Sequence, residues 1–316
     1  MRRLLLLRSG ALAGAVALTF AGAVAPAAAV TPTSDRGAAE CFDPHDVGAG
    51  ARGAGNNHQG PDHRDVSASE QRAIAKRTAR ILATRGVSKA EAKKQAAATS
   101  IPVYVHVMRD DDGSGDVTDL QIDQQIDVLN TTFGGGESDD ATDTGFRFAL
   151  ADTFRYDNSA WHNDHGSNKY RSETRQGGAD ALNIWLVDFK YLGIATFPWD
   201  YANKGAVDGI RVHYASLPGG SIENFNLGET ATHEAGHWLG LFHTFQGGCT
   251  ETNDQVADTP AQSSPTSGCP EGRDSCALPG LDPIHNYMDY SWDSCYTEFS
   301  AGQTSRMADA FAAFRS

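Results

Sequence analysis

The chain has 316 residues, with 26 lysines and arginines against 40 aspartates and glutamates, and a formal net charge of −14 at pH 7. This excess of negative charge argues against nucleic acid and anionic membranes as partners, because both are themselves negatively charged. Cationic substrates are favoured instead. After the amino-terminal segment, no apolar run approaches the length that a membrane-spanning helix needs, so we expect no membrane anchor.

The first 29 residues have the pattern of an export signal. A basic start is followed by an apolar run and by small residues at 27–29, where a signal peptidase would cut. We therefore predict a signal peptide at 1–29 and a secreted, extracellular protein. The pair Arg2 and Arg3 leaves twin-arginine export open beside the ordinary secretory route.

The next segment divides into two parts. Residues 30–65 are rich in glycine, alanine, aspartate and proline without hydrophobic periodicity, which is typical of extended or poorly ordered chain. Residues 67–97 have apolar residues at helical spacing and a basic polar face. We interpret 30–97 as a pro-segment that is held electrostatically on an acidic catalytic domain; a solvated linker is the alternative.

Residues 98–316 show the patterns of one α+β domain. Alternating or continuous apolar runs predict five strands, at 101–109, 146–154, 182–189, 192–197 and 209–213. Helical spacing and capping residues predict four helices, at 118–133, 171–181, 227–239 and 300–314. In the first of these helices, we expect the inward residues to be Leu120, Ile122, Ile126 and Leu129.

The most specific signal in the chain is His-Glu-Ala-Gly-His-Trp-Leu-Gly-Leu-Phe-His at 233–243. On a helix, His233 and His237 share one face, where both imidazoles can bind the same zinc ion. His243 can join them only if the helix ends first, because a continuous helix would turn it by roughly 240° onto the far side. Gly240 permits that end, since glycine adopts the left-handed conformation without a Cβ clash.

Glu234 follows the first of these histidines directly, where it would flank the open position of the metal. Three neutral imidazoles leave zinc its double positive charge and a fourth position for water, whose pKa then falls toward neutrality. The Glu234 carboxylate can take the proton of that water and pass it to a leaving amine. The motif therefore predicts metal-assisted hydrolysis without a covalent intermediate.

HEAGHWLGLFHTFQGGC followed by NYMDY resembles the pappalysin branch of the metzincins, the cytophagalysin-like secreted endopeptidases, over most of residues 100–316. The resemblance implies a twisted, mixed five-stranded sheet and an active-site helix above a loop-rich, disulfide-tied lower subdomain with a C-terminal helix. It also implies that Met288 packs beneath the histidines without binding the metal. Tyr290 would donate a hydrogen bond to the developing oxyanion; a core tyrosine is the alternative.

The same resemblance suggests how a substrate is held. Residues 192–197 correspond to the edge strand, so Leu192, Gly193 and Ala195 are expected to pair with an extended peptide through main-chain hydrogen bonds. Asp293 follows the methionine turn and could place a carboxylate in the pocket for the side chain after the scissile bond. That carboxylate would favour Arg or Lys there. An exposed surface aspartate is the alternative.

The five cysteines suit an oxidising compartment. Four cluster around the histidine motif and the methionine turn and allow three pairings, among which spacing does not choose; the resemblance implies Cys249–Cys276 and Cys269–Cys295. Cys41 stands alone. Its thiolate could occupy the fourth zinc position as a latency switch, with Asp43 or Asp46 as substitutes, or it could be a spare thiol or form an intermolecular disulfide.

A second, structural metal is suggested by the acidic loop at 252–262. Asp254, Asp258 and Thr259, with the Val256 carbonyl, offer oxygens suited to calcium. The loop lacks the glycine register of an EF-hand, so the prediction depends on similarity to calcium-stabilised pappalysins. A solvated acidic loop is the alternative.

Together these patterns predict a monomeric, secreted zinc endopeptidase that cuts polypeptides, with a preference for sites before Arg or Lys, and that is inhibited by its own pro-segment. Its expected partners are polypeptide substrates, without nucleic acid or membrane. One rival is a non-catalytic zinc-binding module for adhesion or inhibition on the same fold, although such a module would not need Glu234. A second rival is a zinc hydrolase of small amides, but an edge strand beside an open cleft favours polypeptides.

Overall fold

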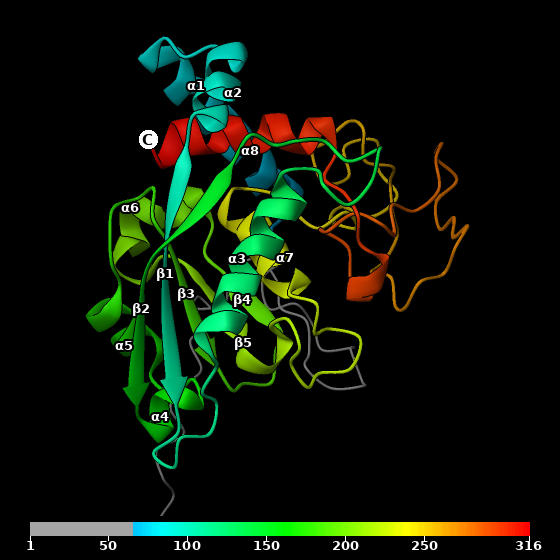
Figure 1. Cartoon of the computed structure of the whole chain (residues 1–316). Helices are drawn as coiled ribbons and strands as arrows, with labels where there is room; N and C mark the ends of the chain where they lie inside the picture. The colour runs from blue at the N-terminus through cyan, green and yellow to red at the C-terminus, as the bar shows by residue number, and fades with distance from the viewer. Residues whose placement is uncertain (1–65) are drawn as a thin grey trace, which may run out of the picture. The chain divides into compact units, whose positions relative to one another are not determined.

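The computed structural model describes residues 66–316 (Figure 1). The predicted signal peptide at 1–29, the segment 30–65 and Cys41 lie outside the described residues. Within the described part, no helix has both the length and the apolar character needed to cross a membrane.

The centre of the domain is a five-stranded sheet with the strand order β2-β1-β3-β5-β4. Strand β4 runs antiparallel to β5 at one edge, and the other pairs are parallel, so the sheet is mixed. The bounds are β1 Ser100–Arg109, β2 Arg147–Asp157, β3 Leu182–Val187, β4 Gly193–Ala195 and β5 Ile210–His213. Each lies in a region where a strand was predicted, but β4 is shorter than the expected 192–197, because the chain enters a 3-10 turn at Pro198.

Helices surround this sheet. Their bounds are α1 Ala68–Arg85, α2 Lys89–Ala97, α3 Asp119–Phe133, α4 Ser159–His162, α5 Ser167–Thr174, α6 Tyr201–Lys204, α7 Glu229–Trp238 and α8 Ala301–Phe314. Short 3-10 turns occur at η1 Pro198–Asp200, η2 Gly205–Val207, η3 Tyr214–Ser216 and η4 Asp293–Cys295. The two long predicted helices α3 and α8 begin at capping boxes, Thr118 with Gln121 and Ser300 with Gln303, which satisfy the first free backbone N–H groups.

The two faces of the sheet are covered differently. Helices α3 and α7 lie on one face (Figure 1), where alternate residues of β1 such as Val105 and Val107 join the main hydrophobic core. The next residue along, Met108, packs on the opposite face with Trp185 and with Tyr170 of α5. This alternation follows from the two-residue period of a strand.

Two details of the predicted helices were wrong. Leu120 was expected to face inward but is 66% exposed. The buried stripe of α3 instead follows the helical period through Ile122, Ile126, Leu129 and Phe133, and Leu120 lies on the other side. The helix predicted at 171–181 begins earlier, at Ser167, and ends at Thr174. A glycine pair follows, and Gly177 has φ +74°, which the helix could not have accommodated.

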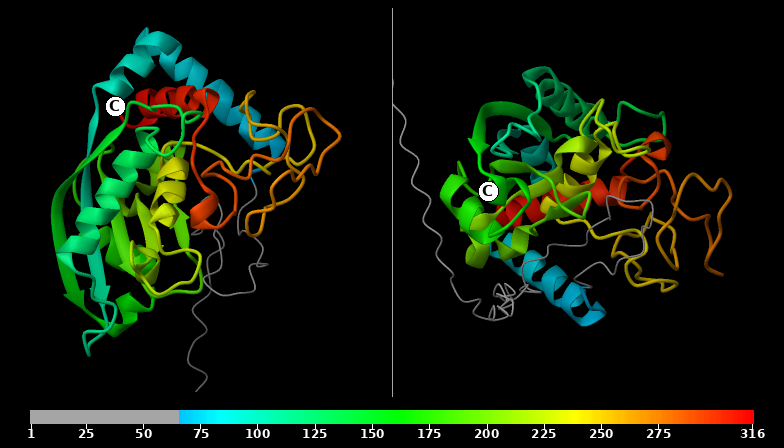
Figure 2. Two further views of the ribbon diagram at one scale, coloured as in Figure 1. Left: turned by 45° about the vertical axis from the view of Figure 1, so that its right-hand side comes forward. Right: turned by 90° about the horizontal axis from the view of Figure 1, so that it is seen from below.

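Helices α1 and α2 meet at an angle, and both pack against α8 (Figure 2). Ile74 of α1 belongs to an aromatic cluster with Phe197, Trp199 and Phe242. The Nη1 atoms of two arginines on α1 donate to backbone carbonyls of the domain, Arg77 to Trp199 at 3.3 Å and Arg85 to Ala312 at 2.6 Å. Apolar burial and arginine-to-carbonyl hydrogen bonds therefore hold α1 in place.

The region between α7 and α8 has little regular structure and carries both disulfides, Cys249–Cys276 and Cys269–Cys295. These are the pairings that the resemblance implied. The buried Asp289 carboxylate adds a polar anchor, since it accepts hydrogen bonds from the Gln262 amide, the Thr266 N–H and the Tyr290 N–H at 2.8–3.0 Å. Cross-links and buried polar contacts thus position loops that regular secondary structure does not.

Candidate metal centre

Helix α7 carries His233 and His237 and ends at Trp238, before His243. This end allows His243 to reach the same face as the other two histidines. Gly240 has φ +105°. Its N–H donates to the His237 carbonyl at 2.8 Å, and the Leu241 N–H donates to the Gly236 carbonyl at 3.0 Å. This pair of bonds is the Schellman arrangement, which ends a helix and turns the chain back. The turn returns His243 to the face that holds the other two histidines.

The three imidazoles converge on one point. The Nε2 atom of His237 lies 3.1 Å from Nε2 of His233 and 3.1 Å from Nε2 of His243. All three side chains are buried. In the part of the chain that the structure describes, no other group of three or more His, Cys, Asp or Glu residues is arranged to hold a metal ion.

The backbone fixes which nitrogens face inward. Nδ1 of His233 lies 2.6 Å from the Tyr287 carbonyl, and Nδ1 of His237 lies 2.9 Å from the Leu241 carbonyl. Because a carbonyl only accepts hydrogen bonds, each Nδ1 carries the proton and each Nε2 keeps a lone pair. Lone pairs so close together need a cation between them, and ligands at about 2.0–2.1 Å from tetrahedral zinc would be separated by about 3.3 Å. The residues fit a zinc ion.

Glu234 lies against the edge strand β4. Its side chain is 1% exposed, and it occupies the space that a Cβ atom on Gly193 would need, since that Cβ would come within 2.5 Å of Oε1. Glycine at this position therefore lets the helix and the edge strand approach each other. The contact brings the Glu234 carboxylate next to strand β4, one residue after a histidine of the centre.

Met288 packs against helix α7 at Gly236, next to the histidines. It is fully buried, and a Cβ on Gly236 would lie only 2.5 Å from its sulfur, so the thioether fills the gap beneath α7. Its carbonyl accepts a hydrogen bond from Thr244, the residue after His243, at 3.2 Å. Together with the Tyr287 carbonyl, the methionine turn therefore contacts both segments that supply histidines.

Tyr290 is buried and lies beside the histidines. Its ring centroid is 4.9 Å from that of His243 and 5.7 Å from that of His233. Phe245 completes this wall, because its ring stacks on His243 at 4.7 Å and an interplanar angle of 10°. The sequence analysis missed Phe245, for which the only signal was its place two residues after a ligand.

Asp293 is 3% exposed, so the alternative of an exposed surface aspartate is wrong. Its Oδ2 accepts a hydrogen bond from the Leu227 N–H at 2.9 Å, and its own N–H donates to the Asn224 carbonyl at 3.0 Å. The carboxylate thus ties the start of η4 to the loop that leads into α7. The side chain is therefore an internal carboxyl group between the methionine turn and α7.

Several of the oxygens proposed for calcium are engaged in protein hydrogen bonds, but Oδ2 of Asp254 is buried without a hydrogen-bond partner among the described residues. Oδ1 of Asp254 accepts from the Val256 N–H at 3.0 Å and from the Thr259 hydroxyl at 2.8 Å. The Asp258 carboxylate caps α8, where it accepts from the Ser300 hydroxyl at 2.7 Å and from the Gly302 N–H at 2.8 Å. Burial raises the pKa of Asp254 to about 7. A calcium ion in this loop stays a prediction.

The remaining histidines of interest are packed or paired with protein groups. His106 is buried between Phe154 and Trp185, and burial lowers its pKa to about 4, so it is neutral. His213 lies 3.3 Å from Asp188, and Nδ1 of His285 lies 2.6 Å from the Cys295 carbonyl. None of them approaches the metal centre as a fourth ligand.

A buried ion pair anchors the carboxyl end of α7. The Arg315 guanidinium contacts both oxygens of Asp208, at 2.9 and 3.1 Å, and its Nε donates to the Trp238 carbonyl at 2.9 Å. The Trp238 indole donates to the same carboxylate at 3.0 Å. These residues lie far apart in the chain and form no motif, so the sequence analysis did not find them.

Sequence comparison places the chain among extracellular metalloproteases. A family model described as pregnancy-associated plasma protein-A (peptidase family M43) matches residues 187–312. An extracellular metalloprotease of Sordaria macrospora is 44% identical over 250 residues, which cover 77% of this chain and 83% of that protein. Another, of Pyricularia oryzae, is 46% identical over 231 residues, which cover 71% and 78%.

Solved structures agree in fold. Mature mirolysin of Tannerella forsythia, determined in complex with a cleaved peptide, aligns with a TM-score of 0.59 at 30% identity and covers 66% of this chain and 90% of its own. A promirolysin mutant aligns with a TM-score of 0.65 at 25% identity and covers 79% and 94%. The chain therefore belongs to the pappalysin family of metzincins, has their α+β fold, and is a secreted, extracellular metalloendopeptidase.

Proposed function

We propose that His233, His237 and His243 hold one zinc ion and that Glu234 is the general base for peptide-bond hydrolysis. The observation that carries this proposal is the convergence of the three Nε2 atoms, with two of the rings oriented by carbonyls at Nδ1. A zinc ion held there supplies a Lewis acid that polarises the scissile carbonyl and lowers the pKa of a water molecule. The rest of the chemistry falls to the side chains around it.

Glu234 has the position that a base requires. Its carboxylate lies beside the backbone of Gly193, the first residue of the edge strand, so it faces the region where a peptide paired with that strand would run. It takes a proton from the attacking water and returns it to the leaving nitrogen. The Tyr290 hydroxyl, beside His233 and His243, donates a hydrogen bond to the oxyanion.

The edge strand β4 is the proposed binding site for the polypeptide backbone of the substrate. Because β4 pairs on one side with β5 and is last in the strand order, its outer edge can add an extended peptide through main-chain hydrogen bonds. Leu192, Gly193 and Ala195 are the residues proposed to contact that peptide. Recognition by main-chain groups suits an endopeptidase, which meets many different side chains.

The metal itself provides the direct test. Dialysis against a strong chelator is expected to abolish peptidase activity, and one equivalent of zinc per chain is expected to restore it, because the proposed mechanism activates the attacking water on the metal that the three histidines hold. Metal analysis of the purified protein should show about one zinc per chain at this centre. Full activity in metal-free protein would contradict the proposal, and restoration by calcium alone would assign the centre to another ion.

Replacing Gly193 with alanine should reduce activity without removing the metal. The new Cβ would meet the Glu234 side chain, so the base must move or the edge strand must separate from α7. A displacement of about 1 Å at a reacting group can cost about a hundredfold in rate. The measurement is kcat/KM together with zinc content, and the matched control is Gly205→Ala, at a glycine of η2 that has φ −55° and lies outside β4. Unchanged kcat/KM in Gly193→Ala would show that the contact does not position the base.

We propose that Asp293 makes the enzyme prefer Arg or Lys immediately after the cut. The carboxylate is buried between η4 and the loop before α7, so an incoming cation would meet a weakly solvated anion. Cleavage of a denatured proteome, read by mass spectrometry, should show basic residues enriched at that position. The isosteric variant Asp293→Asn keeps an acceptor for Leu227 and is expected to lose the enrichment. A wild-type profile dominated by aliphatic residues would refute the assignment.

We further propose a signal peptide at 1–29, a pro-segment at 30–97 that inhibits the enzyme, a monomeric catalytic domain at 98–316, and a structural calcium ion in the 254–259 loop. In support, the promirolysin chain covers a larger share of this chain than mature mirolysin does. Cys41 would act as the latency switch. A Cys41→Ala proenzyme that stays as latent as the wild type would remove Cys41 from this role.

A further inference from the structure

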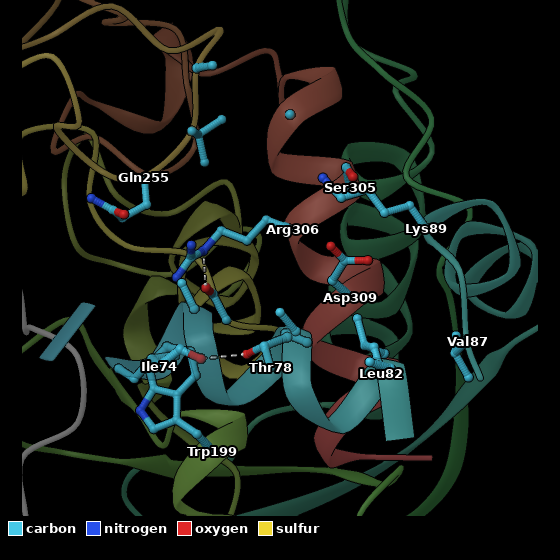
Figure 3. Close-up of a pocket in the computed structure, with 18 residues that line it drawn as sticks. Ile74, Thr78, Leu82, Val87, Lys89, Trp199, Gln255, Ser305, Arg306 and Asp309 are labelled. Atoms are coloured by element: carbon cyan, nitrogen blue, oxygen red, sulfur yellow. Dashed lines mark hydrogen bonds between the residues drawn. The ribbon is translucent and has the colours of Figure 1, made fainter. Parts of the chain in front are cut away.

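A half-enclosed cavity of about 630 Å³ lies between helices α1 and α8 (Figure 3). None of the three histidines lines it. Its walls are mainly apolar and include Ile74, Leu82, Val87, Trp199 and Val256. A volume of this size is typical of sites for small organic ligands.

The cavity forms because most residues of α1 that border it have small side chains. Ile74 and Leu82 are buried in separate hydrophobic clusters of the domain, so they anchor α1 at two points. Between and beside them, the residues of α1 that face the cavity are Ala75, Thr78, Ala79 and Ala83. These side chains are too short to fill the space beneath the helix, which protein interiors normally close.

Two opposite charges lie side by side in this cavity. Arg306 and Asp309 are three residues apart on α8, so they share a face, and Figure 3 shows both side chains directed into the space next to α1. They form no ion pair with each other, and no ion pair joins Arg306 to any other carboxylate within residues 66–316. The carboxylate that acts most strongly on Arg306 is Asp254, and the cation that acts most strongly on Asp309 is Lys89, but neither forms an ion pair with it among the described residues. Because buried or half-buried charges are normally paired, both groups suit a closer external partner.

The other contacts of Arg306 fix its direction. Its Nε donates to the Gly240 carbonyl at 2.8 Å, and the guanidinium lies 4.4 Å from the centroid of the Phe242 ring. Desolvation lowers its pKa to about 10, so it remains a cation at neutral pH. The terminal Nη groups, which donate to no protein oxygen among the described residues, remain available as a fork for a carboxylate.

One polar atom of this charged pair lacks a hydrogen-bond partner among the described residues, Oδ1 of Asp309. Burial raises the pKa of Asp309, while Lys89 and Arg306 lower it. The cavity therefore offers a donor fork and a carboxyl group within largely apolar walls.

We propose that this cavity binds a short zwitterionic peptide with apolar side chains. Its terminal carboxylate would pair with Arg306, its terminal ammonium with Asp309, and its side chains would pack against Ile74, Leu82 and Val87. Neighbouring residues at this helical spacing lie about 5–6 Å apart, which matches the two ends of a very short peptide. An amphipathic anion such as a fatty acid would satisfy Arg306 but would bring a second negative charge to Asp309.

Binding would link the catalytic domain to its own amino-terminal helices. One wall of the cavity is α1 and the opposite wall is α8, so a ligand that touches both stabilises the docked position of α1. Because α1 belongs to the segment proposed as the pro-segment, the inference assigns this peptide site to the chain before that segment is removed. None of the three histidines lines the site, so its residues do not depend on the assignment of zinc or of the catalytic base.

Calorimetric titration of leucyl-leucine into the full chain tests the proposal, with Glu234→Gln as the background so that the chain does not cut itself. We expect saturable binding of one dipeptide per chain. N-acetyl-leucyl-leucine amide, which lacks both charges, should not bind. Asp309→Asn, which is isosteric, should weaken binding by about tenfold or more, and Arg306→Lys should also weaken it. Asp123→Asn, at an exposed position of α3, is the matched control and should not change it.

A second measurement distinguishes this cavity from the substrate cleft. Leucyl-leucine bound beneath α1 should slow tryptic cleavage of that helix after Arg80, whereas a dipeptide in the cleft should not. The proposal is overturned if leucyl-leucine does not bind, if Asp309→Asn binds it as tightly as the parent chain, or if α1 gains no protection. Binding of decanoate in its place would show that the cavity takes amphipathic anions instead.

Discussion

Replacing Glu234 with alanine is expected to abolish peptidase activity while leaving about one zinc ion bound per chain. The three histidines remain, and their orientation by the Tyr287 and Leu241 carbonyls does not involve the glutamate. Only the proton transfers are lost. A positioned acid or base is worth about 10²–10⁴-fold in rate, so kcat should fall by at least that factor.

Three measurements make this expectation specific. Metal analysis should separate Glu234→Ala, which keeps zinc, from His243→Ala, which should lose it with the activity. Glu223→Ala, at an exposed acid in the loop before α7, should behave as the wild type. Thermal melting shows whether each variant is folded. An active Glu234→Ala enzyme would exclude this glutamate as the base, and a folded but metal-free one would show that it helps to hold the ion.

The largest loss of stability is expected from Asp208→Asn. This substitution keeps the shape of the side chain but leaves the Arg315 guanidinium buried beside a neutral amide, and desolvation already lowers the pKa of that arginine. Removing one partner of a buried pair typically costs about 3–5 kcal/mol, because the remaining charge is uncompensated. The same carboxylate also accepts from the Trp238 indole, so the carboxyl end of α7 should loosen.

The exposed pair between Asp143 and Arg147 provides the matched control. Its partners lie 2.9 Å apart, but both side chains are about half exposed, at 55% and 45%. Such pairs contribute about 0–1 kcal/mol, so Asp143→Asn should leave the unfolding midpoint nearly unchanged. Denaturant unfolding measures both variants. Equal losses of unfolding free energy in Asp208→Asn and Asp143→Asn would show that burial does not increase the contribution of the Asp208–Arg315 pair to stability.

Features with a local physical cause could be predicted from the sequence. The strands followed from two-residue alternation, and α3 and α8 followed from helical spacing with capping residues at Thr118 and Ser300. The need for a glycine at 240 followed from the geometry of a helix that must end between His237 and His243, and Gly240 indeed has positive φ. Local rules failed at Leu120, where an apolar residue near a helix start lies outside the buried stripe.

Resemblance to known proteases supplied what spacing alone did not. The disulfide pairing was open among three choices until the likeness to pappalysins selected the one that the structure contains. The roles of Met288 and Tyr290 also came from the methionine turn of that family. In the structure their positions have a physical basis, since Met288 fills the space beneath Gly236 and Tyr290 packs beside His243.

By itself, the sequence determined the histidine motif and most of the secondary structure, and it supplied the predictions of a general base and an export signal, because each depends on residues close together in the chain. Only the tertiary structure decided which carbonyls orient the histidines, that Asp293 is buried, and that Asp208 pairs with Arg315. It also placed Arg306 and Asp309 on the wall of a cavity closed by α1. Such contacts join residues that are far apart in the chain. Hydrophobic periodicity and helix or strand propensity are local properties, so they do not predict which distant residues come into contact on folding.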